Sequence, residues 1–177
     1  MFSSPWWPKH LILGFAALLG AAFLIDALLP PPLQRAHINS VLVTDRLGKP
    51  LRAFSAPDGR WRFAVRLEEI DPAFIEALVR VEDKRYWTHA GTDWAGMVRA
   101  GADSVLAGRI VSGGSTISMQ TARMLEPRPR NAGSKLVEIW RANQLERRFT
   151  KEEILELYLT LTHGHLDLIE RGVRVAD

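Results

Sequence analysis

The sequence predicts a mainly α-helical protein with a small N-terminal β element and one transmembrane helix. Three observations lead to this fold class: a long apolar run near the N-terminus, a stretch of short β-rich segments between turn residues, and a C-terminal part whose apolar residues recur at helical spacing. Of the 177 residues, 47% are hydrophobic and 24% are charged, as in ordinary globular proteins. The length favours a single domain.

The apolar run predicts a membrane anchor. Residues 11–25 read LILGFAALLGAAFLI, and each of them is apolar or glycine. With Trp6 and Trp7 before it and the residues up to 29 after it, the run reaches the roughly 20 residues that span a bilayer. Lys9 favours a cytoplasmic N-terminus. We therefore expect a short cytoplasmic tail at 1–10 and a transmembrane signal anchor at 11–29. A cleaved signal peptide is the alternative, and in both cases the remainder is exported.

The next segment, residues 30–66, predicts a linker and a small β element. It begins with three consecutive prolines, which stiffen the chain. Residues 40–44 (SVLVT) and 51–54 are rich in strand-forming residues, and residues 61–65 alternate apolar with basic side chains. Glycine-containing turns separate these pieces, so we expect several short strands.

From residue 67 onward the pattern predicts helices. Asp71 can cap a helix that has Pro72 at its first position, and Phe74, Ile75, Leu78, Val79 and Val81 supply its apolar face. Ser134 can cap a later helix, and Thr150 with Glu153 forms a capping box. The expected helices cover residues 72–82, 93–107, 117–125, 134–148 and 150–161.

Charge and cysteine content narrow the possible functions. The net charge is +3 at pH 7, which suits an anionic partner such as nucleic acid or an acidic membrane surface. If the chain is anchored and exported, nucleic acid becomes an unsuitable partner. The absence of cysteine excludes disulfides, a thiolate nucleophile and a cysteine-ligated metal.

An acid–base cluster follows the first expected helix. Residues 81–91 read VEDKRYWTHAG, in which Glu82 and Asp83 end the helix and His89 lies in a loop. Taken alone, such a cluster is more often a solvated helix end than a catalytic loop, because most surface acids have no catalytic role.

Two further segments have residue types that suit an anionic substrate. In SGGSTISMQTAR, residues 112–123, Ser115 and Thr116 precede a helix start, where unpaired N–H groups can bind anions; the alternative is an ordinary helix cap. Lys135 and Glu138 are three residues apart and share one helix face, which could equally be an exposed ion pair.

Four segments of the chain, in this order, match a set of known motifs. Glu82, Asp83, Tyr86, His89 and Gly91 match E-D-x-x-F-x-x-H-x-G; Gly113, Ser115, Thr116 and Gln120 match G-x-S-T-x-x-Q-Q; Lys135 and Glu138 match R-K-x-x-E; Lys151, Ile154, Leu155, Glu156, Tyr158 and Leu159 match K-x-x-I-L-E-x-Y-L-N. In this order the chain resembles the peptidoglycan glycosyltransferase domain of class A penicillin-binding proteins, glycosyltransferase family 51. The stretch RIVSGGSTISMQTARML looks most like the 1C subgroup of that family.

The resemblance implies a fold and an activity. The fold is a lysozyme-like helical glycosyltransferase domain over residues 67–177. The reaction joins lipid II units into glycan strands in cell-wall synthesis, with release of undecaprenyl pyrophosphate. The implied partners are lipid II, the growing glycan strand and the bacterial membrane, with other cell-wall synthesis proteins as further candidates. The implied location is the bacterial inner (cytoplasmic) membrane, crossed once, with the catalytic part on the periplasmic or outer side.

The resemblance also implies roles for individual residues. Glu82 is the expected general base, and Glu138 is the expected second catalytic carboxylate, acting near the pyrophosphate directly or through a divalent metal ion (magnesium or manganese). No other cofactor is implied. The expected substrate-binding residues are Ser115, Thr116, Gln120, Arg123 and Lys135, together with Asp83 and His89, which also support the loop.

The sequence departs from the family pattern at several points. Tyr86, Ser134 and Thr160 stand where phenylalanine, arginine and asparagine are usual. After Leu161 the family continues into a further helical lobe, whereas this chain reads THGHLDLIERGVRVAD, so we expect an incomplete C-terminal part. Two alternatives therefore stay open: an inactive truncated remnant or membrane-anchored scaffold, and a hydrolase of glycan strands, since paired carboxylates also serve glycoside hydrolysis.

Overall fold

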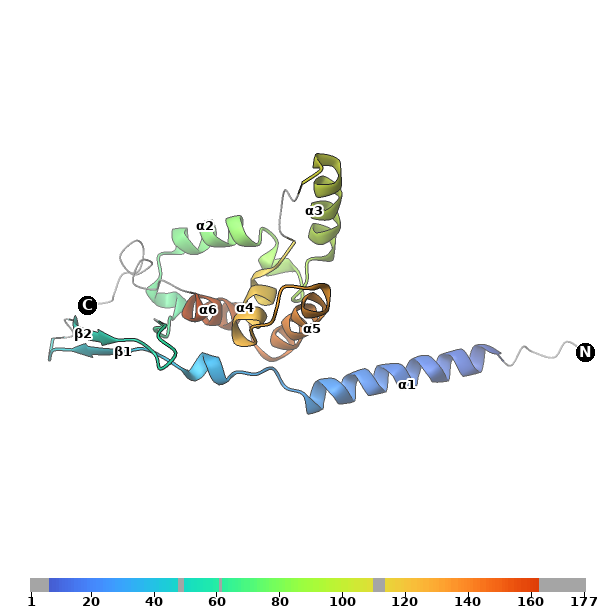
Figure 1. Cartoon of the computed structure of the whole chain (residues 1–177), viewed down its shortest axis with the longest axis horizontal. Helices are drawn as coiled ribbons and strands as arrows, with labels where there is room; N and C mark the ends of the chain where they lie inside the picture. The colour runs from blue at the N-terminus through green and yellow to red at the C-terminus, as the bar shows by residue number, and fades with distance from the viewer. Residues whose placement is uncertain (1–6, 48–49, 61, 110–113, 163–177) are drawn as a thin grey trace, which may run out of the picture. The chain divides into compact units, whose positions relative to one another are not determined.

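The structure is a computed structural model that describes residues 7–47, 50–60, 62–109 and 114–162 (Figure 1). The chain divides into two units, Met1–Pro31 and Pro32–Asp177. Trp61 and Gly113, which entered the sequence-based predictions, lie outside the described residues.

In the described part of the first unit, residues 7–31, the chain forms helix α1 (Trp7–Leu28), so the helical part of the N-terminal prediction is confirmed. Apolar side chains such as Phe15, Phe23 and Ile25 are at least half exposed on it. Within the described ranges, however, no helix combines the length and the apolar character needed to cross a bilayer.

The expected β element forms a hairpin. Strands β1 (Val41–Thr44) and β2 (Pro50–Phe54) pair antiparallel, with Val41 opposite Phe54. Every residue of β1 is exposed, so the hairpin does not contribute to the hydrophobic core.

The further strand expected over residues 61–65 is wrong for its described residues, 62–65, which have no strand geometry. Two hydrogen bonds with Ser40, one to its hydroxyl and one from its backbone, take the place of a β ladder there. The Arg62 N–H donates to Ser40 Oγ over 2.8 Å, and the Ser40 N–H donates to the Arg62 carbonyl over 2.6 Å. The Arg62 guanidinium is almost fully buried and forms an ion pair with Asp58 at 2.5 Å.

The other elements described in the second unit are helices. Its elements are η1 (Gln34–His37), η2 (Leu67–Glu69), α2 (Pro72–Glu82), η3 (Tyr86–Thr88), α3 (Trp94–Ala107), α4 (Ile117–Leu125), α5 (Ala132–Arg148) and α6 (Lys151–Leu161), where η marks a short 3₁₀ helix. This mainly helical architecture fits a helical glycosyltransferase domain. As predicted, Asp71 caps α2 by accepting from the Ala73 N–H over 2.9 Å, and Thr150 and Glu153 form a capping box at α6.

Two local predictions are corrected by the structure. Helix α5 begins at Ala132 with Asn131 as its cap, whose Oδ1 accepts from the Ser134 N–H over 2.8 Å, so Ser134 is inside the helix. Both residue types are good caps, and the sequence offered no reason to choose the earlier one. Val81 was expected on the buried face of α2 but is 79% exposed. It lies two residues after Val79, the buried residue of this helix, and thus about 200° around the helix axis from it.

The core lies where α4 packs against α5 and α6 (Figure 1). Its fully buried side chains include Tyr86, Ile117, Leu145, Ile154 and Leu155. Helix α3 is mostly exposed, with Ala100 as its buried residue, and it stands away from this core in Figure 1. The packed helices α4, α5 and α6 therefore form the base next to which α2 ends and α4 begins.

Side chains of α6 fasten the linker onto this core. Glu156 accepts from the Leu67 N–H over 2.9 Å, and Thr160 accepts from the Val65 N–H over 3.2 Å. Thr160, which replaces the family's usual asparagine, thus satisfies a linker N–H.

The corrected cap gives a simple test. Replacing Asn131 by Ala removes the acceptor of the Ser134 N–H, and we expect the free energy of unfolding to fall by about 1 kcal/mol. Ser134→Ala is the control and should leave it nearly unchanged. Urea denaturation followed by circular dichroism measures the free energy of unfolding of both variants. A larger loss for Ser134→Ala than for Asn131→Ala would show that Ser134 is the cap.

Candidate active site

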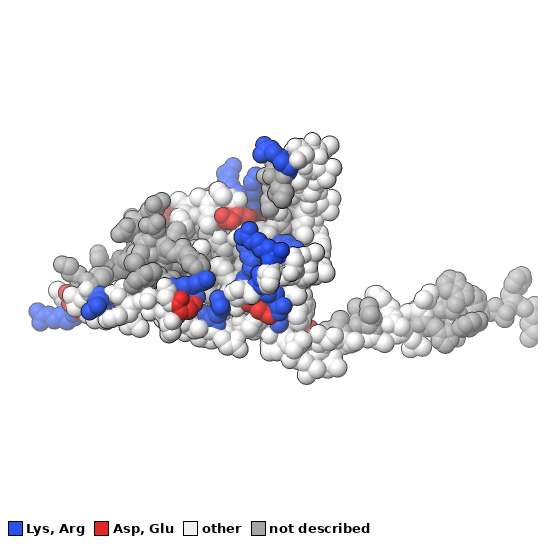
Figure 2. Space-filling model, in the orientation of Figure 1, with Lys and Arg blue, Asp and Glu red and all other residues white. Residues whose placement is uncertain are grey.

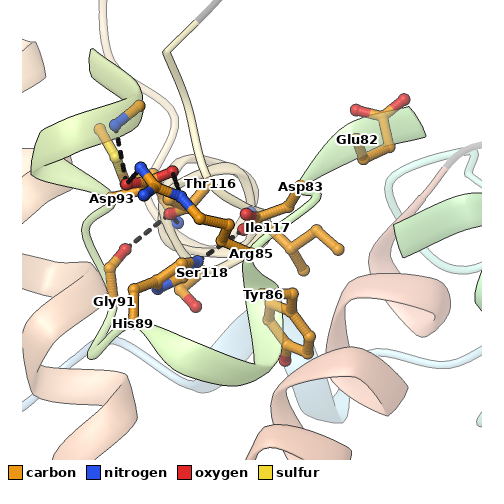
Figure 3. A network of polar contacts seen from close by, with 12 residues as sticks. Glu82, Asp83, Arg85, Tyr86, His89, Gly91, Asp93, Thr116, Ile117 and Ser118 are labelled. Atoms are coloured by element: carbon orange, nitrogen blue, oxygen red, sulfur yellow. Dashed lines mark hydrogen bonds and ion pairs between the residues drawn. The ribbon is translucent and has the colours of Figure 1, made fainter. Parts of the chain in front are cut away.

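The two adjacent acids at the end of α2 lie in different surroundings. Glu82 is the last residue of the helix and is exposed, whereas Asp83 is 7% exposed. Asp83 Oδ2 lies 2.9 Å from His89 Nε2 and accepts from the Ile117 N–H over 3.0 Å. Figure 3 shows this arrangement, with the Glu82 carboxylate pointing away from Asp83. Only Glu82 is free to reach a substrate, while Asp83 fixes the start of α4.

His89 is part of this internal network. Its side chain is 8% exposed, and its Nε2–H can donate to the Asp83 carboxylate. Its other nitrogen, Nδ1, is buried and has no hydrogen-bond partner among the described residues. The imidazole packs edge-on against Tyr86, with ring centroids 6.1 Å apart. This placement suits support of the loop, and a substrate-binding role for His89 stays a prediction.

Thr116 caps α4 and holds the same loop. Its Oγ1 accepts from the Met119 N–H over 3.2 Å and donates to the Gly91 carbonyl over 2.6 Å. Thr116 is only 2% exposed, and its hydroxyl already makes two hydrogen bonds within the protein. The hydroxyl therefore has a structural role. The expected substrate contact from Thr116 is thus limited to what its backbone can offer.

Gly91 allows this close packing. Its φ is +87°, and a Cβ atom at this position would lie 2.9 Å from the backbone of Ala142 in α5. A side chain would therefore meet both backbone strain and a steric clash with a rigid helix.

We expect Gly91→Ala to lower the free energy of unfolding by more than the about 1–2 kcal/mol that a left-handed conformation costs an ordinary residue. Gly108→Ala is the matched control, since Gly108 has a φ of +63° and nothing within 4 Å of its would-be Cβ. Urea denaturation of both variants separates the cost of the left-handed backbone, which both share, from the cost of the clash with Ala142, which only Gly91→Ala has. Equal losses would show that the approach of Ala142 does not matter.

Glu82 has a direct partner on α4. Gln120 Nε2 donates to Glu82 Oε2 over 3.0 Å, which ties the exposed carboxylate to the helix that begins at Ile117. Tyr158 of α6 lies close to the same charge. Burial, and next the charge of Glu82, raise the pKa of Tyr158 to about 12, while Arg123 opposes the shift. The motif match alone did not reveal that Tyr158 lies near this carboxylate.

A second group of predicted site residues also meets in space. Lys135 Nζ donates to Ser115 Oγ over 2.7 Å and lies 3.2 Å from Glu138 Oε2. Arg123 Nε lies 4.0 Å from Glu138 Oε1. The Glu138 side chain is 11% exposed, whereas those of Lys135 and Arg123 are more than one third exposed. The two cations therefore remain accessible to an anion, with Glu138 between them.

A protein-held divalent metal does not fit this second group. Both Glu138 oxygens already face a cation, and no cluster of three or more histidine, cysteine, aspartate or glutamate side chains occurs within the described part of the chain. A hard divalent ion prefers several oxygen ligands and is repelled by adjacent ammonium and guanidinium groups.

A cavity of about 370 Å³ lies between the end of α2, the inner face of α3 and the residues before α4. The predicted residues Glu82, Asp83, Ser115 and Thr116 line it. It is also lined by residues that the sequence analysis did not single out: Lys84, Asp93, Arg99 and Asp103. The spacing of Arg99 and Asp103, four residues apart on one helix, could have indicated a shared face of α3.

Asp93 and Arg85 fix the α3 side of the cavity. The Arg85 guanidinium pairs with both oxygens of Asp93, and Asp93 Oδ1 accepts from the Gly96 N–H over 2.8 Å to cap α3 (Figure 3). Burial works against ionisation, but the Gly96 N–H and the Arg85 guanidinium together hold the pKa of Asp93 below its ordinary value. The start of α3 is thereby tied to the segment that follows Glu82.

The visible face of the protein carries charges of both signs. Figure 2 shows basic and acidic side chains next to one another on the second unit, with no extended surface of one sign.

Comparison with known proteins identifies the family. Residues 47–166 match the family model described as Transglycosylase. The chain is 42% identical to penicillin-binding protein 1C of Escherichia coli over 139 residues, covering 78% of this chain and 18% of that protein. It is 34% identical to penicillin-binding protein 1A of the same organism over 159 residues, covering 84% and 18%.

A shorter relative matches as well. The chain is 32% identical to the biosynthetic peptidoglycan transglycosylase of Mesorhizobium japonicum over 139 residues, covering 76% of this chain and 57% of that protein. The chain thus spans about a fifth of the length of the E. coli relatives and somewhat more than half of the M. japonicum protein. The matched segment contains the cavity, both groups of site residues and α2 to α6, and the chain belongs to the transglycosylase family.

Proposed function

We propose that the protein is a peptidoglycan glycosyltransferase, which polymerises lipid II into glycan strands and releases undecaprenyl pyrophosphate. The observation that carries this proposal is the separation of two chemical groups: an exposed carboxylate, Glu82, at the cavity, and an accessible pair of cations, Lys135 and Arg123, around Glu138. Glycosyl transfer from a lipid pyrophosphate needs both a base and a site for a leaving anion.

Glu82 is suited to the base role. A sugar hydroxyl has a pKa far above 7, so a carboxylate must take its proton as the oxygen attacks the anomeric carbon. Gln120 holds Glu82 Oε2 with a hydrogen bond of 3.0 Å and leaves the other oxygen available. As the new C–O bond forms, the proton moves to Glu82, and the bond from the anomeric carbon to the pyrophosphate oxygen breaks with inversion.

Lys135 and Arg123 are suited to the leaving group. The departing oxygen takes the bonding electron pair, and the negative charge that develops on the pyrophosphate is stabilised by fixed cations. Ser115, which accepts from Lys135 Nζ over 2.7 Å, joins this cation to the cavity wall. Glu138 holds both cations in place, so its role in this proposal is to orient them.

The experiment offers the protein two substrates that distinguish synthesis from degradation. Labelled lipid II in detergent is expected to give glycan strands, and finished peptidoglycan is expected to stay intact. Release of soluble fragments from finished peptidoglycan, with no strands from lipid II, would instead establish a glycan-strand hydrolase. No turnover of either substrate would favour a binding or scaffold function.

We also propose that α1 anchors the protein in the bacterial inner membrane, with the catalytic unit on the periplasmic or outer side. Support comes from the exposed apolar side chains of α1, including Leu13 at 65% and Phe23 at 77%, which cost free energy in water. A lipid-linked substrate also requires a site close to the bilayer.

Flotation of the protein with lipid vesicles tests the anchor. Leu13→Asp with Phe23→Asp should abolish flotation, because each charge placed in the apolar layer costs about 2.5–3.5 kcal/mol. Val41→Asp, on the equally exposed β1 hairpin, is the control and should float like the unaltered protein. Flotation of the double variant at the unaltered level would reject α1 as the anchor.

A further inference from the structure

A nearly buried ion pair lies beneath the candidate site and outside its cavity. Glu146 of α5 has a side chain that is 8% exposed, and its Oε1 lies 2.7 Å from Lys151 Nζ at the start of α6. The same oxygen accepts from Ser118 Oγ of α4 over 2.5 Å. One carboxylate oxygen therefore joins the three helices of the core.

Lys151 connects this pair to the segment that carries Glu82. The Tyr86 hydroxyl donates to the Lys151 carbonyl over 2.5 Å, and Lys151 Nζ lies 4.5 Å from the centroid of the Tyr86 ring. Tyr86 is fully buried, and its N–H donates to the Asp83 carbonyl over 2.9 Å. Burial, and next the charge of Glu146, raise the pKa of Tyr86 above its ordinary value.

Ser118 connects the pair to the other wall of the site. It directly follows two residues that hold the loop: the Thr116 hydroxyl donates to the Gly91 carbonyl, and the Ile117 N–H donates to Asp83. Ser118 also lies two residues before Gln120 in α4. The ion pair is thus hydrogen-bonded to Ser118 on one side, and on the other side its ammonium group lies over the ring of Tyr86, whose hydroxyl is bonded to the Lys151 backbone. These two segments bring Gln120 and Glu82 together.

We propose that Glu146 and Lys151 form a positioning pair that holds the base Glu82 against α4. The pair touches neither the cavity nor the substrate groups proposed above, so it acts through Tyr86 and Ser118. This inference rests on the proposed function for the role of Glu82. The geometric part, that the pair fixes two segments of the chain, stands apart from any activity.

Replacement by apolar side chains separates positioning from stability. Removing one partner of a nearly buried pair leaves an uncompensated charge, whereas replacing both by apolar residues of similar volume is often neutral for stability. The test variant is therefore Glu146→Met with Lys151→Met, which also removes the acceptor of Ser118. Ser118→Ala is a milder second variant. Arg66→Met with Glu68→Met is the control, because that ion pair is 3.7 Å long and both side chains are more than two thirds exposed.

Hydrogen exchange of the amides in residues 82–92 and 114–121, measured without substrate, reports the geometry directly. We expect faster exchange in both segments of the Glu146/Lys151 double variant, in the second segment of Ser118→Ala, and in neither segment of the control. In strand synthesis, the double variant should keep its KM while kcat falls by about 10- to 100-fold, as for a misplaced catalytic group.

The two readouts keep this inference apart from the proposed function. Unchanged exchange in both segments of the double variant overturns the positioning pair, and so does a loss of kcat without faster exchange. If the unaltered protein makes no strands from lipid II, the proposed function fails, and the exchange comparison still decides whether the pair holds the two segments.

Discussion

Replacing Glu82 by Gln is expected to lower kcat for strand synthesis by about 10²–10⁴-fold, the usual contribution of a general base. The amide is nearly isosteric and can still meet Gln120, but it cannot take the proton of the attacking hydroxyl. Because the change removes a group that acts in the transition state, the affinity for lipid II should survive. Strand formation from labelled lipid II and equilibrium binding of lipid II measure the two quantities.

The control for this prediction is Glu68→Gln. Glu68 is an exposed acid of η2 whose ion pair with Arg66 is 3.7 Å long, and it lines no part of the cavity. The Glu68→Gln enzyme should retain full activity. A Glu82→Gln enzyme with unaltered kcat would remove Glu82 as the base, and a loss of lipid II binding of the same size would make it a binding residue instead.

Replacing Lys135 by Met is expected to lower kcat by about 10²–10³-fold, as is typical when one fixed group that stabilises developing negative charge is lost. The methionine keeps most of the apolar stem of the lysine. It also leaves the mostly buried Glu138 with Arg123 as its remaining described cation, 4.0 Å away, so the free energy of unfolding should fall as well. Steady-state kinetics and urea denaturation measure the two effects.

Arg128→Met is the matched control for the cation. Arg128 pairs with Glu126 in the connection between α4 and α5, and its side chain is 39% exposed, close to the value for Lys135. It should change kcat little. If both variants lost the same activity, the effect of Lys135 would be one of general charge and not of its place beside Ser115 and Glu138.

Much of the fold was predictable because local signals decide it. The Asp71 cap before Pro72 and the Thr150 capping box are satisfied by residues only a few positions away, so the sequence contains the whole interaction. The choice between Asn131 and Ser134 was not predictable, since either residue can cap a helix. The missing strand near Arg62 depended on Ser40, a partner 22 residues away.

The site was predictable in composition but not in arrangement. The motifs identified Glu82 and Asp83 together, yet one is exposed and the other is 7% exposed, because only Asp83 turns toward His89 and the start of α4. Thr116 was expected at the substrate, but its hydroxyl is bonded to Gly91. The Asp83–His89 contact spans only six positions, but the contacts with Ile117 and Thr116 join residues more than 20 positions apart, which no local pattern encodes.

The structure explains one departure from the family pattern. Tyr86 stands where phenylalanine is usual, and its hydroxyl donates to the Lys151 carbonyl. The additional hydrogen bond strengthens the connection between the segment after Glu82 and α6. It is one of the contacts on which the proposed positioning pair relies.

The most direct test of glycosyl transfer by this protein is the stoichiometry of one turnover. Lipid II labelled in both its sugar and its lipid pyrophosphate should give one released lipid pyrophosphate for each new glycosidic bond, and Glu82→Gln should suppress both together. Release of lipid pyrophosphate without any new sugar linkage would contradict glycosyl transfer and indicate hydrolysis. Sugar linkages formed at an unaltered rate in the variant would contradict the role of Glu82.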